Sequence, residues 1–66
     1  MKNKTEIQFK ALMDYNPSTV MEIKEHNFLL KAFMKKTSDK KMSKECSTKL
    51  VSNSLLESAY WRSISN

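Results

Sequence analysis

Few side chains in this 66-residue sequence could carry out chemistry. It contains one cysteine, Cys46, and one histidine, His26. A catalytic nucleophile needs a base and an orienting group beside it, and a structural zinc ion needs about four Cys or His ligands. No such set exists here, so the sequence predicts no catalytic residue, no metal site and no cofactor. We expect Cys46 to fill a core position and His26 to be a partly exposed histidine on a helix.

A second group of residues has the composition of a binding site. Tyr60, Trp61 and Arg62 are consecutive, and these three residue types dominate the energetics of protein interfaces. They could contact a partner or anchor the end of the last helix, and both interpretations stay open.

The sequence also contains no glycine, which excludes the phosphate-binding loops that need Gly where the backbone approaches a phosphate group. An enzyme is therefore not expected.

The chain is basic, with a formal net charge of +5. Its lysines are densest between Lys35 and Lys49. They could form a solvated turn, or an electrostatic footprint for nucleic acid or an acidic partner. A single arginine, Arg62, is unfavourable for nucleic acid, because base and phosphate recognition depends on bidentate Arg contacts.

The elements that position these residues are expected to be helices. The first helix is predicted over residues 5–15, where Thr5 and Gln8 have the spacing of a capping box. A proline then interrupts the pattern. We expect Asn16 to end the first helix and cap the second, with Pro17 at the first helical position.

The second helix is predicted over residues 17–36, with apolar positions on two separate faces. The first face has the three-and-four spacing of a seam against a neighbouring helix, and comprises Val20, Ile23, Asn27, Leu30 and Met34. The second face, separated from it by Lys24, Lys31 and Lys35, comprises Met21, Phe28 and Ala32.

The third helix is predicted to begin near Asp39 or Ser43 and to run toward Ile64. One side carries a seam of Met42, Cys46, Leu50, Asn53, Leu56, Tyr60 and Ile64, and the opposite side carries Val51, Leu55 and Ala59. Asn27 and Asn53 each interrupt a seam. They could pair across the two helices and fix their register, or lie at a wet edge.

The polar turn between the last two helices predicts an all-α fold, an antiparallel helical hairpin with a short N-terminal helix, in a single domain over residues 1–66. Two helices cover only one face of each other, so the remaining apolar faces are exposed, and such surface usually marks an interaction site. A chain this short also buries little core, so we expect a partner, or homodimer formation when the protein is alone. The predicted partner-binding residues are Met21, Phe28, Ala32, Val51, Leu55, Ala59 and Trp61.

No apolar run exceeds three residues in this sequence. It therefore predicts neither a signal peptide nor a membrane span. The expected location is a reducing cytoplasm.

The order of elements resembles a known family. A short first segment, a break at Asn16-Pro17, a long helix, a turn over residues 36–40 and a second long helix are similar to the YscE-like co-chaperones of type III secretion needle subunits. The sequence of residues 55–59, Leu-Leu-Glu-Ser-Ala, looks like the Leu-Glu-small-small stretch of that family. The turn here lacks Gly, and Tyr60-Trp61 is bulkier than the aliphatic residues expected at that place.

This resemblance implies a non-enzymatic co-chaperone that pairs with a larger helical-repeat chaperone. The pair would keep a secretion needle subunit soluble and monomeric before export. The alternative is a small basic three-helix DNA-binding or anti-activator regulator, with Lys35 to Lys49 as the phosphate contact. We expect no specific nucleic-acid binding.

Overall fold

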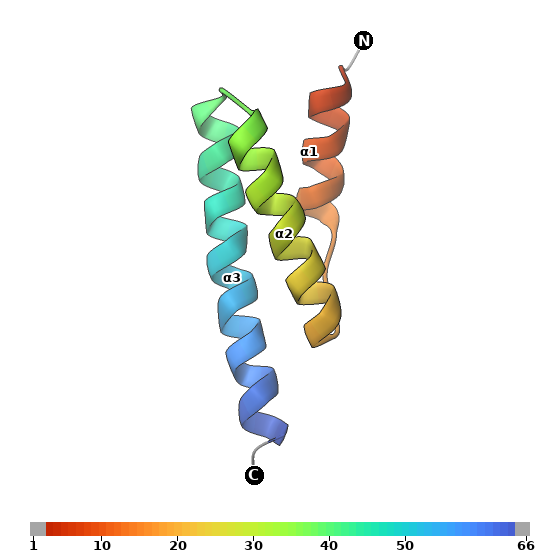
Figure 1. The fold of residues 1–66 in the computed structure, drawn as a ribbon, viewed down its shortest axis with the longest axis vertical. Helices are drawn as coiled ribbons and strands as arrows, with labels where there is room; N and C mark the ends of the chain where they lie inside the picture. The colour runs from red at the N-terminus through yellow and green to blue at the C-terminus, as the bar shows by residue number, and fades with distance from the viewer. Residues whose placement is uncertain (1–2, 65–66) are drawn as a thin grey trace.

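The protein is built from three α-helices, and the all-α prediction is confirmed for the part of the chain that the structure describes. The computed structural model describes residues 3–64. The helices are α1 (Lys4–Asp14), α2 (Val20–Lys36) and α3 (Lys40–Ile64). The molecule is elongated, with extents of 49 × 18 × 14 Å. α3 lies along α2, and α1 lies on the other side of α2 (Figure 1).

The start of α1 differs from the prediction. Asn3, not Thr5, is the N-cap: its side-chain oxygen accepts a hydrogen bond from the Glu6 amide at 2.8 Å. Its carbonyl oxygen accepts from the Ile7 amide at 3.2 Å. Asn is among the strongest N-cap residues, so the helix begins at Lys4 and the capping box predicted with Gln8 does not form.

The start of α2 lies three residues later than predicted, because Thr19 and Glu22 form a complete capping box. The Thr19 hydroxyl accepts from the Glu22 amide at 3.1 Å, and the Glu22 carboxylate accepts from the Thr19 amide at 3.2 Å. The Ser18 hydroxyl donates to the same carboxylate at 2.7 Å. This bond is the largest of the interactions that lower the pKa of Glu22. Asn16 and Pro17, predicted as cap and first helical residue, belong to the connection, where Pro17 is buried.

Three residues connect α2 to α3. α2 ends at Lys36, and Thr37 closes it in an extended conformation, with its amide donating to the Phe33 carbonyl at 2.9 Å. The Asp39 carboxylate then accepts from the amides of Lys41 and Met42 at 2.9 and 3.1 Å. These bonds satisfy free amides of the first turn of α3. Of the two predicted starting points, Asp39 is the one that agrees with the structure.

The core lies where all three helices meet. Leu30, Phe33 and Cys46 are its buried centre, and the partly buried hydrophobic residues around it include Phe9, Leu12 and Met13 from α1. The rings of Phe9 and Phe33 lie 5.7 Å apart. Phe33 was not part of the predicted α2 seam, because that seam was derived for one neighbouring helix. α1 covers a further side of α2, and this second contact buries Phe33.

Within the described residues, no helix is long and apolar enough to cross a membrane.

Replacement of Leu30 tests this core. Leu30 is fully buried, so Leu30→Ala should lower the free energy of unfolding by about 2–5 kcal/mol, the usual cost of a core cavity. Its neighbour Leu29 is 53% exposed, so Leu29→Ala is the matched control and should cost less than about 1 kcal/mol. Urea denaturation followed by circular dichroism measures both, and equal losses would contradict this description of the core.

Candidate functional site

A polar cluster lies inside the bundle, where His26, Asn27 and Asn53 meet. The Nε2 atom of His26 lies 2.9 Å from the carbonyl oxygen of Leu12 in α1. The Nδ1 atom lies 2.9 Å from the Nδ2 atom of Asn53 in α3. Nδ2 also donates to the Oδ1 atom of Asn27 at 2.8 Å. One chain of hydrogen bonds therefore joins all three helices.

The partners determine the proton positions in this cluster. A backbone carbonyl can only accept, so Nε2 of His26 carries a hydrogen and donates it to Leu12. The Asn53 amide donates its two hydrogens to Nδ1 of His26 and to Asn27. His26 is therefore the neutral Nε2–H tautomer, and both of its ring nitrogens are engaged. A ring nitrogen bound in this way is not available as a base or a metal ligand, so the cluster is suited to holding the helices together.

The structure corrects the prediction for His26 and decides between the two interpretations of the asparagines. His26 was predicted as partly exposed, but it is 2% exposed, because α1 and Tyr15 cover the side of α2 on which it lies. The ring of Tyr15 is centred 4.9 Å from the imidazole. The pairing of Asn27 with Asn53 is confirmed by their hydrogen bond. The wet-edge alternative is wrong for Asn53, which is 2% exposed.

An open groove of about 540 Å³ lies beside this cluster, between α1 and α2. Its apolar lining includes Ala11, Leu29 and Ala32, and two carboxylates, Glu22 and Glu25, lie along it. The pKa of the Tyr15 hydroxyl is raised, first by desolvation and then by the charge of Glu22. No group of three or more potential metal-ligating side chains occurs among residues 3–64.

The predicted partner-binding residues of α2 are divided between two surfaces. Met21 and Phe28 are each 72% exposed and point away from the core. Ala32 is half-buried and lines the α1–α2 groove. The structure therefore brings Met21 and Phe28 together on one outer face, and assigns Ala32 to a different surface, which α1 partly covers.

The predicted residues of α3 lie on its outer side. Val51 and Leu55 are 59% and 69% exposed, and Ala59 is exposed as well. Trp61 is half exposed, and its indole nitrogen donates to the Glu57 carboxylate at 3.2 Å. The Trp61 ring also packs edge-on against Tyr60 at 6.2 Å. Trp61 thus stabilises its own helix while it leaves much of its surface accessible, which keeps both earlier interpretations of it open.

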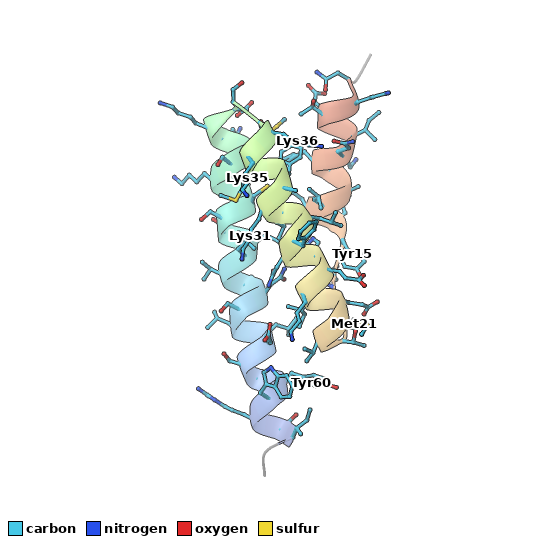
Figure 2. The ribbon with its side chains drawn as sticks, viewed as in Figure 1. Tyr15, Met21, Lys31, Lys35, Lys36 and Tyr60 are labelled. Carbon is cyan, nitrogen blue, oxygen red and sulfur yellow. The ribbon has the colours of Figure 1, made fainter. Side chains whose placement is uncertain are left out.

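Sequence reasoning missed the exposed end of the α3 seam. Leu56, Tyr60 and Ile64 belong to the predicted seam of the third helix, but they are 47%, 40% and 58% exposed. α3 has 25 residues and α2 has 17, so α3 is longer by about 12 Å and extends past the first turn of α2 (Figure 1). Figure 2 shows Tyr60 on this extension, beyond Met21. The difference in helix length was the available signal, and the early predicted start of α2 concealed it.

Cys46 is fully buried in the core, as predicted. Burial raises the pKa of its thiol, and the charge of Glu45 raises it further. Because the thiolate is the reactive form, both effects lower the reactivity of this cysteine in the folded protein.

Replacement of Asn53 tests the polar cluster. Asn53→Ala removes the donor to both His26 and Asn27, so it should lower the free energy of unfolding by about 1–3 kcal/mol, the cost of buried polar atoms left without partners. The neighbouring Ser54 is exposed, so Ser54→Ala is the control and should change stability by less than about 0.5 kcal/mol. Nitrogen NMR shifts of the imidazole should show the Nε2–H tautomer in the wild-type protein. Equal effects of the two variants, or an Nδ1–H tautomer, would contradict the cluster.

The thiol of Cys46 reports the opening of the core. At neutral pH it should react with a disulfide reagent roughly tenfold or more slowly than in the urea-unfolded chain, because reaction requires exposure and a thiolate. The raised pKa sets the direction of the pH dependence: in the folded protein the rate should rise with pH and should keep rising beyond the usual titration range of a cysteine. Equal rates in the folded and unfolded states would show that Cys46 is accessible.

No family model, curated protein or solved structure matches this chain. The resemblance to the YscE-like co-chaperones therefore stays a prediction.

Proposed function

We propose that this protein acts by stoichiometric binding, without catalysis, and that a larger helical protein covers the outer surface of its third helix. The observation that carries the proposal is the α3 seam, which continues beyond its last buried residue, Asn53, as the exposed side chains of Leu56, Tyr60 and Ile64. α2 covers one half of this seam and leaves the other half open. The open half is suited to binding a second helix, which would lie along α3 where α2 does not reach.

The exposed apolar groups of α3 can contribute to the stability of such an interface. Burial of a large apolar side chain contributes about 1.5–3 kcal/mol, and the seam residues are already about half covered. Each of them therefore still offers roughly half of that stabilisation. Val51 and Leu55, which are more exposed, enlarge the available surface around the helix. A partner that surrounds α3 would reach both sides, whereas a single flat surface would reach one.

In its specific form, the proposal is a co-chaperone of a type III secretion needle subunit in the bacterial cytoplasm. α2 and α3 would serve as the helical hairpin of the YscE-like resemblance, and α1 as its short N-terminal helix. A larger helical-repeat chaperone would bind α3, and the pair would shield an aggregation-prone helix of the needle subunit. The support for this form is the order of the elements and the two exposed apolar surfaces.

Photo-cross-linking in the native host tests this proposal. A photoreactive phenylalanine analogue at Leu55 or Leu56 should cross-link to a helical-repeat protein of larger mass, and the complex should contain the needle subunit. Lys10, which is exposed on α1, is the control position and should give no such product.

Two results would contradict the proposal. If positions 55 and 56 cross-link only to another copy of this chain, the α3 surface is a homodimer interface. If they give the same products as position 10, α3 is not the binding surface. Mass spectrometry of the cross-linked peptides distinguishes these outcomes.

A further inference from the structure

The outer face of α2 has a pattern different from that of α3, because it combines large apolar groups with lysines. Its five residues follow one another at steps of three and four: Met21, Lys24, Phe28, Lys31 and Lys35. All five are exposed, and Figure 2 shows Lys31 and Lys35 following one another along α2. We call this set the lysine–phenylalanine face.

The spacing of this face suits a helix as its occupant. Steps of three and four place side chains in one row along a helix, the arrangement by which two helices pack lengthwise. From Met21 to Lys35 the row is about 21 Å long, or roughly four helical turns. Phe28, at its centre, is 72% exposed and is the largest apolar group that a partner could cover.

The charges specify the chemistry of that helix. Three lysines lie in the row, whereas the carboxylates of the same helix, Glu22 and Glu25, line the groove on the α1 side. A partner helix would be complementary if it placed Asp or Glu beside its apolar residues. A second copy of this chain would not be complementary. Face-to-face pairing of two such faces would bring six lysines together, and such like-charge contacts are costly.

We propose that the lysine–phenylalanine face binds an acidic amphipathic helix, at a surface distinct from the α3 extension. This inference goes beyond the proposed function, since it assigns a second partner surface and the chemistry of its ligand. Lysine stems can pack along apolar groups while their ammonium groups reach carboxylates at the rim. Exposed charge pairs are screened by salt, so binding should combine a salt-sensitive part with a salt-resistant part from Phe28.

Two synthetic helical peptides of about 20 residues serve as probes. Both carry the same leucine face, flanked by Glu in one peptide and by Lys in the other. Isothermal titration calorimetry with the full chain should show at least tenfold tighter binding of the Glu peptide, as expected for complementary rather than opposed charges. The affinity should fall several-fold when NaCl rises from about 0.05 to 0.5 M.

Variants then locate the binding surface. Phe28→Ala should weaken the binding of the Glu peptide about tenfold or more, as expected for the loss of an interface anchor. The triple variant K24E/K31E/K35E should reverse the preference toward the Lys peptide. The matched control K10E/K41E/K44E changes the net charge equally at other exposed lysines and should keep the original preference. Circular dichroism verifies folding, and K24Q/K31Q/K35Q replaces the Glu triple if that one unfolds.

Three outcomes would overturn the proposal. Equal binding of the two peptides would show that charge has no role. Equal losses of affinity for the Glu peptide in the triple variant and in its control would show that only the net charge of the protein matters. Tighter binding of a short DNA duplex, unaffected by Phe28→Ala, would assign the lysines to nucleic acid. Leu55→Ala should leave peptide binding unchanged, so a failure here does not decide the cross-linking test on α3, and the converse also holds.

Discussion

The arrangement of the three helices depends on the carboxamide of Asn53. Its two hydrogens are donated to His26 and Asn27, and His26 passes the connection on to the carbonyl of Leu12. No buried side-chain polar atom in the described part of the chain lacks a partner. A shift of α3 by one helical turn would leave several of these groups unpaired, at about 1–3 kcal/mol each. That sum is large against the total stability expected of a domain, about 5–15 kcal/mol. The cluster therefore selects one register among those that the apolar seams alone would permit.

This register also determines which surfaces stay open. Asn53 lies opposite His26 and Asn27, which belong to the first half of α2. The N-terminal end of α2 therefore does not reach the last turns of α3, and these turns stay uncovered. The bond between His26 and the Leu12 carbonyl holds α1 against one side of α2, so that side is buried and the outer face of α2 is left to solvent. The polar core and the two proposed binding surfaces are thus consequences of one alignment. A change in the length of α2 would alter the surface that α3 exposes and leave the buried cluster in place.

Much of this fold could be predicted from periodicity. The existence of three helices, the buried positions of Leu30 and Cys46, the contact of Asn27 with Asn53 and the exposure of Phe28 all follow from side-chain spacing. The helix starts were less accessible, because Asn3, Thr5, Asn16 and Thr19 are all competent caps, and only the path of the backbone decides among them. His26 could not be placed at all from its own helix. Its burial depends on a contact with a backbone carbonyl of α1. Every residue has a backbone carbonyl, so the residue types of α1 do not indicate which one accepts this bond.

The backbone of the described residues never enters the left-handed region. Both interhelical connections are made from extended and right-handed conformations, so no position in residues 3–64 requires glycine for steric reasons. Such a chain can accept replacement at most of its sequence while it keeps its shape, provided that the apolar periodicity, the caps and the buried carboxamide are retained. Proteins that share this backbone should therefore resemble one another in the places of Asn3, Thr19, Asp39 and Asn53 more than in overall sequence identity.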